Sequence, residues 1–357
     1  MPDGCLLLLG LLGPDLTTEE ADLFKRLQPA GFILFSRNIV SAVQTRRLTD
    51  DLRGLSKMPP IIAIDQEGGR VTRTGAIAPV APSAPALAAV GNMRHIRDAA
   101  VLTAGLLRLL GINMNFAPVL DLDHFPETSN ALRGRCWGRD PQRVIDFAGQ
   151  WNRWSRSRGV AGCAKHFPAC GRAVSDPHHD LPSCPVTWEE LQREDVIPYT
   201  ALMPELDAVM LAHVEFPNID ADFPASLSPK MVRRLLRDQL GFDRHLVLTD
   251  DLDMGAIQGR YGRGDDVRLA IEAGNDLAMI CHRTETAEDA ARALAGVSHS
   301  IRSEARERVE KFRWKVLQAP LDWSDEKWRQ TCDGLAALAT VYQNDATADA
   351  TGPVADY

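Results

Sequence analysis

The sequence has 357 residues, with 40 Lys and Arg against 48 Asp and Glu, so its formal net charge is −8 at pH 7. The hydrophobic fraction of 45% and the charged fraction of 25% are those of an average globular protein, which excludes wholesale disorder, a collagen-like repeat and a coiled coil. The acidic balance, without a run of basic residues, argues against nucleic acid or a membrane surface as a partner. The length allows one large α/β domain or two ordinary domains.

The cysteines and the apolar N-terminus bear on the cellular compartment in which we expect the protein. The seven cysteines are odd in number and scattered, which favours reduced thiols over a disulfide framework. The apolar start CLLLLGLL has no basic segment before it and is cut off by Gly13-Pro14-Asp15, so we interpret it as a buried strand instead of a signal peptide. It is also too short to cross a bilayer. We therefore expect a cytoplasmic protein.

Eight short apolar runs recur along the chain, each followed by a stretch with helical periodicity. The runs are nearly continuous in apolar residues, as expected for parallel strands that are covered on both faces. They cover residues 5–12, 31–35, 61–65, 112–120, 161–166, 208–213, 245–250 and 276–281. Eight strand–helix units predict an α/β fold, a TIM (β/α)8 barrel, with a doubly wound sheet as the alternative.

Capping residues mark two of the predicted helices. The run Thr17-Thr18-Glu19-Glu20 is typical of a capping box that opens a helix ending near Leu27. Ser228-Pro229 is typical of an N-cap and a first-turn proline, and Gly241 of the stop after a helix over 231–240.

The C-terminal part of the chain continues the helical pattern. Residues 304–314 and 328–342 both have helical periodicity, and the small, polar tail 344–357 is typical of a frayed terminus. We expect a single domain over residues 1–343, with a helical C-terminal extension and a disordered tail over 344–357.

Polar residues end five of the apolar runs. They are Asp65, Asp121, Lys165-His166, His213 and Asp250-Asp251. In a TIM barrel the active site lies at the carboxyl ends of the strands. Charged groups there are costly to desolvate unless they are paired or used, so five such ends together favour a shared polar pocket and an enzyme. A single charged strand end would be typical of a loop salt bridge or a helix cap.

Asp250 follows directly from a strand in HLVLTDDLDM. A strand end would hold its carboxylate rigidly at the barrel mouth, as a nucleophile requires. From the spacing alone an equal alternative stays open, in which Asp250, Asp251 and Asp253 cap the next helix or bind a hard cation.

The segment KHFPACGRAVSDPHHDLP holds a second candidate group. Asp176 lies two residues before His178 and can orient its ring, and histidine titrates near neutrality, as an acid/base group must. Exposed loop histidines are the ordinary alternative. Cys163, His166, Cys170 and His178 do not have the spacing of a zinc module, so we expect no metal site and no cofactor.

A third segment, Asp65-Gln66-Glu67-Gly68-Gly69-Arg70-Val71-Thr72-Arg73, ends a strand in acids and turns at a glycine pair. Its Asp and Arg side chains can together hold sugar hydroxyls, or they can form a structural salt bridge.

Seven segments in this order resemble glycoside hydrolase family 3, and within it the single-domain bacterial β-N-acetylhexosaminidases. They are GFILFSRNI, AIDQEGGRVTR, NFAPVLDLD, RCWGRDP, KHFP with the D-x-H-x-x-x-P that follows, DAVMLAHV, and LGFD…LTDDLDMGAI, between Gly31 and Ile257. The resemblance implies a TIM barrel, in agreement with the strand count. It also implies a retaining exo-β-N-acetylglucosaminidase that acts on peptidoglycan (muropeptide) fragments in cell-wall recycling.

Carried over position by position, the resemblance assigns roles to individual residues. It makes Asp250 the nucleophile and His178, held by Asp176, the acid/base group of a double displacement through a glycosyl-aspartate. The positions that would bind N-acetylglucosamine are Asp65, Arg73, Arg135, Lys165 and His166.

Two positions depart from the family pattern. Ala169-Cys170-Gly171 stands where Gly-His-Gly is usual, and Pro177 stands where Ser or Thr is usual. The missing histidine would support the loop that carries His178, and the proline would stiffen that loop. We therefore expect an altered rate or pH optimum, and retained activity.

Other functions stay open on the sequence. Another family 3 β-glycosidase would use the same residues, as would a phosphorylase, because a neutral imidazole base tolerates an anionic acceptor. A Schiff-base lyase would use Lys165 as its amine. A non-catalytic barrel would bind muropeptides as a sensor. The expected partner is a small carbohydrate, with no nucleic acid or membrane, and the chain is expected to be a monomer or a weak oligomer.

Overall fold

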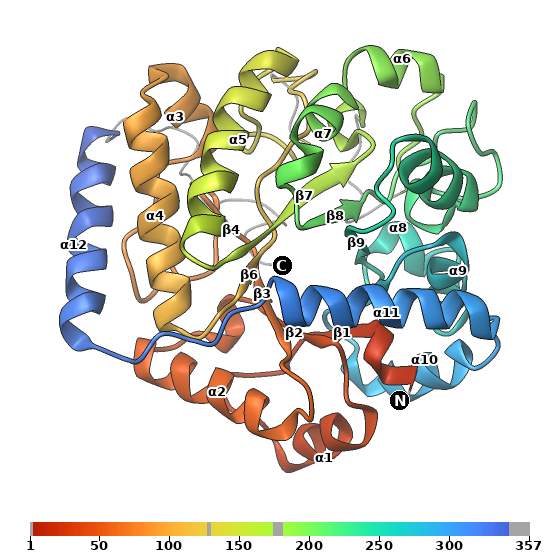
Figure 1. Ribbon diagram of the computed structural model, residues 1–357, viewed down its shortest axis with the longest axis horizontal. Helices are drawn as coiled ribbons and strands as arrows, with labels where there is room; N and C mark the ends of the chain where they lie inside the picture. Colours follow the sequence, from red (N-terminus) through yellow and green to blue (C-terminus); the bar gives the residue numbers. More distant parts are fainter. Residues whose placement is uncertain (1–2, 127–129, 174–180, 343–357) are drawn as a thin grey trace.

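The computed structural model describes residues 3–126, 130–173 and 181–342. Its centre is a closed barrel of parallel strands (Figure 1), which follow one another around the barrel in the order β1-β10-β9-β8-β7-β6-β3-β2. These strands are β1 Leu7–Leu9, β2 Gly31–Leu34, β3 Ile61–Ile64, β6 Met114–Asn115, β7 Ala161–Phe167, β8 Ala208–Leu211, β9 Leu246–Asp251 and β10 Leu277–Ile280. The TIM-barrel prediction is confirmed. The doubly wound alternative is wrong, because β1 pairs with both β2 and β10 and so closes the sheet.

The strands are apolar because both of their faces are covered. Every residue of β1, β2, β3, β8 and β10 is buried, with helices outside and packed side chains inside. The close pairing of β2 with β3 needs a glycine at position 31, because a Cβ there would meet the Ile61 carbonyl oxygen at 2.1 Å.

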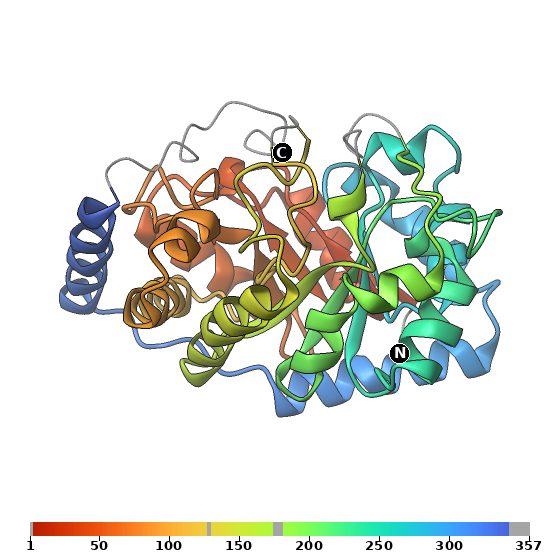
Figure 2. The ribbon, with the colours of Figure 1, turned by 90° about the horizontal axis from the view of Figure 1, so that it is seen from above.

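Helices surround the strands on the outside (Figure 2). The α-helices are α1 Thr18–Leu27, α2 Ala42–Leu55, α3 Ala84–Val90, α4 Met93–Leu109, α5 Pro141–Ser157, α6 Trp188–Arg193, α7 Ile197–Leu202, α8 Gly255–Gln258, α9 Asp265–Ala273, α10 Ala287–Leu294, α11 His299–Lys315 and α12 Asp325–Val341. Short 3₁₀ turns cover Asp3–Leu6, Ser36–Asn38, Cys170–Arg172, Met203–Glu205, Ala225–Leu227 and Thr284–Thr286. Within the described ranges, no helix combines the length and the apolar character needed to cross a bilayer.

Both predicted helix starts form. Thr17 Oγ1 accepts the Glu20 N–H at 3.1 Å and Glu20 Oε2 accepts the Thr17 N–H at 3.0 Å, which completes the capping box of α1. The Ser228 hydroxyl oxygen accepts the Met231 N–H at 3.0 Å. The helix that follows differs from the prediction: it covers Lys230–Gln239 and is of the π type, with wider turns than an α-helix.

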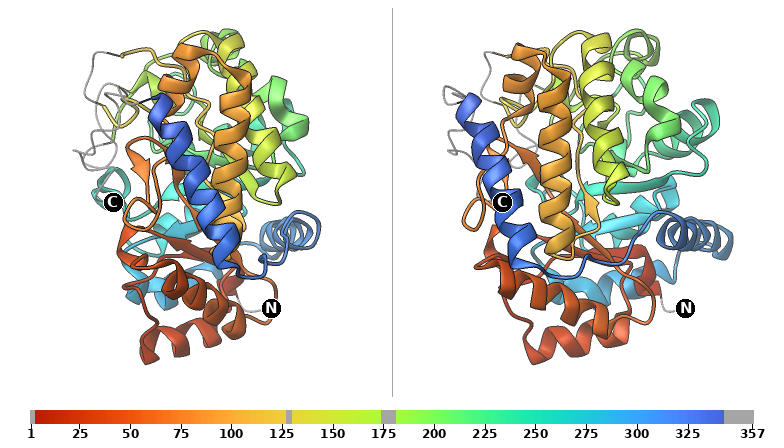
Figure 3. Two further views of the ribbon diagram at one scale, coloured as in Figure 1. Left: turned by 90° about the vertical axis from the view of Figure 1, so that its left-hand side faces the viewer. Right: turned by 60° about the vertical axis from the view of Figure 1, so that its left-hand side comes forward.

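The C-terminal helices take two positions on the barrel. Arg308 Nε donates to Asp276 Oδ1 at 2.6 Å and Arg313 donates to the Ala30 carbonyl at 2.7 Å, so α11 lies against the amino ends of β10 and β2. Helix α12 lies alongside α4 on the outside (Figure 3). The predicted helical extension is confirmed, while the tail 344–357 lies outside the described residues.

Candidate active site

A pocket of about 480 Å³, including space open to solvent, lies at the carboxyl ends of the barrel strands. It brings together six of the eight predicted site residues: Asp65, Arg73, Arg135, Lys165, His166 and Asp250. The two other predicted site residues, Asp176 and His178, lie outside the described residues.

A hairpin after β3 brings Asp65 and Arg73 together. Its strands are β4 Gln66–Gly68 and β5 Val71–Thr72. The Gln66 side-chain oxygen accepts the Arg73 N–H at 3.0 Å, which closes the hairpin. Arg73 Nη2 then lies 3.9 Å from Asp65 Oδ2, and both side chains line the pocket.

Lys165, in β7, lies between two carboxylates. Its Nζ is 2.6 Å from Asp65 Oδ1 and 2.6 Å from Glu67 Oε1. Glu67 also accepts two hydrogen bonds from Arg135, Nε to Oε2 at 2.9 Å and Nη2 to Oε1 at 2.7 Å. This paired geometry is the strong form of an arginine–carboxylate contact.

The charges of this cluster stabilise one another. Burial alone would raise the pKa of Glu67, but the charges of Arg135 and Lys165 outweigh it and hold that pKa well below its usual range. Burial alone would also lower the pKa of Lys165, but Asp65 and Glu67 outweigh it and raise that pKa. Lys165 is therefore an ammonium ion at neutral pH, with no lone pair for a Schiff base.

His166 is held by a carboxylate that lies behind it. Asp121 Oδ2 lies 2.8 Å from both the backbone nitrogen and Nδ1 of His166. Asp121 Oδ1 accepts the Gly171 N–H at 3.1 Å. With Nδ1 engaged in this way, Nε2 is the ring nitrogen that can meet a ligand.

Neighbouring carboxyl groups at the end of β9 have different environments. Asp250 is half-buried and lines the pocket, and its Oδ1 accepts the Asp251 N–H at 2.8 Å. Asp251 is 2% exposed, and its Oδ1 accepts the N–H groups of Cys281 at 3.1 Å and Asp253 at 2.9 Å. Burial, with the nearby charges of Asp253 and Asp250, raises the pKa of Asp251 to about 8. Both carboxyl groups line the pocket, Asp250 as the more exposed of the two, while Asp251 also ties β9 to the end of β10.

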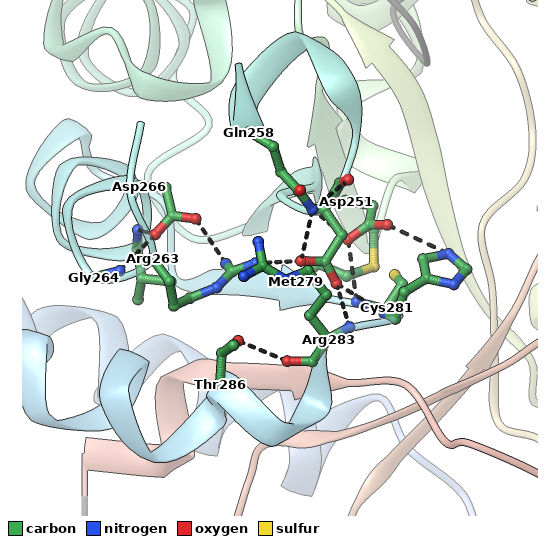
Figure 4. A network of polar contacts seen from close by, with 12 residues as sticks. Asp251, Gln258, Arg263, Gly264, Asp266, Met279, Cys281, Arg283 and Thr286 are labelled. Carbon is green, nitrogen blue, oxygen red and sulfur yellow. Dashed lines mark hydrogen bonds and ion pairs between the residues drawn. The ribbon is translucent and has the colours of Figure 1, made fainter. Parts of the chain in front are cut away.

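The loops behind β9 and β10 are joined by Asp253, whose partners Arg263 and Arg283 are labelled in Figure 4. Its Oδ2 accepts the backbone N–H groups of His282 at 2.8 Å and Arg283 at 2.9 Å, and its Oδ1 forms an ion pair with Arg263. Because Arg263 already supplies the positive charge, the arrangement does not support the hard-cation alternative for Asp250, Asp251 and Asp253.

The prediction that five strand ends share one pocket is wrong for two of them. Asp121 lies behind His166, as described above. His213 is 1% exposed, and its ring nitrogens lie 2.7 Å from Ser226 Oγ and 2.9 Å from the Asp251 carbonyl oxygen. Both side chains contact buried polar groups of the scaffold, and neither lines the pocket.

Sequence reasoning missed two features of the pocket. The first is an apolar wall around Asp250, to which β8 contributes Met210, β10 contributes Met279 and the turn after β9 contributes Met254. Met210 and Met279 lie in apolar strands and Met254 follows Asp253, and nothing in these patterns distinguishes the three from core residues. The second is Glu67, which lies in the segment from Asp65 to Arg73 but was not predicted to take part in the site.

Among the described residues, one group of metal-ligating side chains comes within 4.8 Å: His124, Glu194 and Asp195. Arg172 donates to Asp195 Oδ2 at 2.6 Å and to Glu194 Oε2 at 2.7 Å. His124 Nε2 lies 2.8 Å from Asp195 Oδ1. The guanidinium supplies the positive charge here, so we interpret this cluster as an ion-pair network.

The cysteines form no disulfide, and all seven are free thiols. Cys170, which the sequence resemblance sets against a histidine of the family pattern, is buried at the start of the turn Cys170–Arg172. Burial raises the pKa of the Cys170 thiol well above its ordinary value, and it also raises that of Cys163. Protonated thiols of this kind are poor metal ligands.

The sequence of this chain is similar to those of known proteins. Residues 7–318 match the Glycosyl hydrolase family 3 N terminal domain. The chain is 36% identical over 300 residues to a beta-hexosaminidase of Stenotrophomonas maltophilia strain K279a, covering 82% of this chain and 88% of that protein. It is 32% identical over 337 residues to a beta-hexosaminidase of Pseudomonas aeruginosa strain LESB58, covering 94% of this chain and 98% of that protein.

Solved structures share the fold. A glycoside hydrolase family 3 beta-N-acetylglucosaminidase from Paenibacillus sp. str. FPU-7 has a TM-score of 0.85 at 34% identity, covering 94% of this chain and 67% of that one. NagZ from Neisseria gonorrhoeae, in complex with N-trifluoroacetyl-D-glucosamine, has a TM-score of 0.81 at 28% identity, covering 98% of this chain and 99% of that one. With the family match extending over most of its length, this chain belongs to glycoside hydrolase family 3 and is a glycoside hydrolase.

Proposed function

We propose that the protein is a retaining exo-β-N-acetylglucosaminidase, which removes terminal non-reducing N-acetylglucosamine. The observation that carries the proposal is the single pocket in which the Asp250 carboxylate shares its lining with the predicted sugar-binding residues. The beta-hexosaminidases and beta-N-acetylglucosaminidase similar to this chain support the sugar.

In the proposed mechanism Asp250 attacks the anomeric carbon while His178, oriented by Asp176, protonates the leaving oxygen. His178 then takes a proton from the water that hydrolyses the glycosyl-aspartate. The hydrogen bond from the Asp251 N–H fixes one oxygen of Asp250 and so helps to orient this carboxylate. The roles of His178 and Asp176 rest on the sequence resemblance.

The sugar hydroxyls would be held by the charged side of the pocket. Asp65 can accept hydrogen bonds from hydroxyl groups, while Arg73, Arg135 and Lys165 can donate to their oxygens. Because the same pocket is bounded by the apolar wall near Asp250, the anomeric carbon would meet Asp250 with the far hydroxyls on the charged side.

We further infer that the natural substrate is a muropeptide fragment of peptidoglycan and that the enzyme works in the cytoplasm during cell-wall recycling. The support for this is the resemblance to the single-domain bacterial members of the family. The same resemblance supports a single catalytic domain over residues 1–343, and we propose that it acts as a monomer or weak oligomer.

The test is turnover of 4-nitrophenyl N-acetyl-β-glucosaminide. We expect the wild type to release nitrophenol and Asp250→Ala to release none while keeping its fold. Asp98→Ala, which removes a partly exposed carboxylate of α4, is the control and should keep full activity. A 2-deoxy-2-fluoro glycoside should leave an adduct on the peptide that contains Asp250. Turnover that survives Asp250→Ala would contradict the proposal.

Phosphorolysis by the same residues is the second candidate. Among the described groups, Arg73, Arg135 and Lys165 are balanced by the carboxylates of Asp65, Glu67 and Asp250. The balance leaves no surplus positive charge to bind a phosphate ion. It therefore favours water as the acceptor of the glycosyl group. Product analysis should therefore yield free N-acetylglucosamine with and without phosphate, and a sugar phosphate would reverse this assignment.

A further inference from the structure

We propose that Glu67 is a positioning residue for sugar binding, which holds Arg135 and Lys165 so that their remaining N–H groups face the pocket. The inference rests on the proposed function and deepens it. Glu67 belongs to β4 and is 7% exposed, and it is absent from the pocket lining, whereas both of its cationic partners belong to that lining.

A count of donors shows what the carboxylate does. Lys165 has three N–H groups, and its contacts with Asp65 and Glu67 use two of them. Arg135 has five, of which two bind Glu67 and one binds the Ala131 carbonyl at 3.0 Å. The contacts within the described ranges therefore leave one donor on Lys165 and two on Arg135 for a ligand.

The direction of these remaining donors depends on Glu67. A guanidinium that is bound through Nε and Nη2 is fixed in its plane, so its outer N–H groups have one orientation. The lysine ammonium could rotate about its stem, but the two carboxylates at 2.6 Å hold its third N–H in one direction. Both oxygens of Glu67 are used by these cations, so Glu67 acts on the sugar through them.

A second buried carboxylate provides a matched control. Asp276 also lies between two arginines: its Oδ2 is 2.8 Å from Arg237 Nη2 and its Oδ1 is 2.6 Å from Arg308 Nε. Its side chain is fully buried, and it lies at the amino end of β10, away from the pocket. Loss of its charge removes the same kind of contact without touching the pocket.

The experiment compares Glu67→Gln with Asp276→Asn. Both changes should lower the melting temperature, because each removes the negative charge that compensates two cations. Glu67→Gln should also raise the Kd of N-acetylglucosamine, measured by calorimetry, and the KM for the nitrophenyl glycoside about tenfold or more. It should lower kcat less, since hydroxyl contacts hold substrate and transition state alike. Asp276→Asn should leave Kd and KM unchanged.

A double-mutant cycle then separates positioning from general stability. If Glu67 acts through Arg135, Glu67→Gln has a smaller effect on Kd in an Arg135→Ala background than in the wild type. Glu67→Asp keeps the negative charge but is one methylene shorter, so it provides a folded variant that should also bind the sugar more weakly. Additive effects on Kd, or wild-type Kd in a folded Glu67 variant, would overturn the inference. A wild type that neither binds nor hydrolyses the sugar would instead overturn the proposed function.

Discussion

Asp121 Oδ2 lies 2.8 Å from both the backbone nitrogen and the ring Nδ1 of His166. One carboxylate oxygen thus fixes the peptide and the imidazole of a residue that lines the pocket. The other oxygen accepts the Gly171 N–H, so the same side chain joins the end of β7 to the turn that begins at Cys170. Asp121 therefore links a predicted sugar-binding residue to the turn Cys170–Arg172, which precedes His178 in the sequence.

Asp121→Asn tests this link. An amide can replace only one acceptor oxygen and places an NH₂ against a donor, so we expect kcat/KM to fall about tenfold to a hundredfold and stability to fall by about 1–3 kcal/mol. Asp207→Asn is the control, because Asp207 accepts the Gly162 N–H at 3.2 Å at the other end of β7. That variant should lose stability and keep kcat/KM. An unchanged kcat/KM in Asp121→Asn would contradict the role of this contact.

Asp251 should make stability depend on pH. Its pKa is raised to about 8 by burial and by Asp253 and Asp250, whereas an unfolded Asp has a pKa of about 3.9. Between these values the folded state holds a proton that the unfolded state has released. Its contribution to stability is therefore full below about pH 4 and is lost as the pH rises to about 8, by up to about 1.4 kcal/mol per pH unit.

Urea unfolding of the wild type and of Asp251→Asn at pH 5, 6, 7 and 8 measures this effect. The asparagine cannot ionise, so the stability of the wild type relative to the variant should decrease as the pH rises. A difference that stays constant over this range would show that Asp251 is already ionised in the folded protein.

The apolar wall of the pocket should select the acyl group of the substrate. In the proposed mechanism C1 of the sugar lies at Asp250, so the substituent on C2 lies beside it, where Met210, Met254 and Met279 line the pocket. Met279→Ala removes apolar volume there. We expect kcat/KM for an N-butyryl glycoside, relative to the N-acetyl glycoside, to rise about tenfold or more.

Met114→Ala is the matched control for Met279→Ala in the apolar wall. Met114 is 1% exposed in β6 and does not line the pocket, so its truncation creates a cavity elsewhere in the barrel. It should lower stability by about 2–5 kcal/mol and leave the acyl preference unchanged. The same change of preference in both variants would exclude a specific role for Met279.

Thiol labelling should distinguish Cys332 from the other cysteines. Cys332, in α12, is partly exposed, while the six others are buried. Buried thiols react slowly because they are inaccessible and protonated. A disulfide reagent should therefore label one thiol rapidly in the native protein and all seven after unfolding, and Cys332→Ser should remove the rapid step. Rapid labelling that persists in this variant would contradict the burial of the others.

The barrel and much of its pocket could be predicted from the sequence. Parallel strands that are covered on both faces must be apolar throughout, so the eight runs stand out without knowledge of any partner strand. Strand ends at the mouth of a barrel meet in one place, which is why Asp65, Lys165 and Asp250 could be assigned to the same pocket before any distance was known.

Only the tertiary structure decided which polar groups face a ligand. Asp121 and His213 follow strands as Asp65 does, yet they lie behind the pocket, because buried N–H and C=O groups within their reach require partners. Glu67 received no role from its position in the chain, since its function depends on Lys165 and Arg135, which lie far away in sequence. Local pattern determines where strands begin and end, but hydrogen bonding between distant segments determines what each side chain contacts.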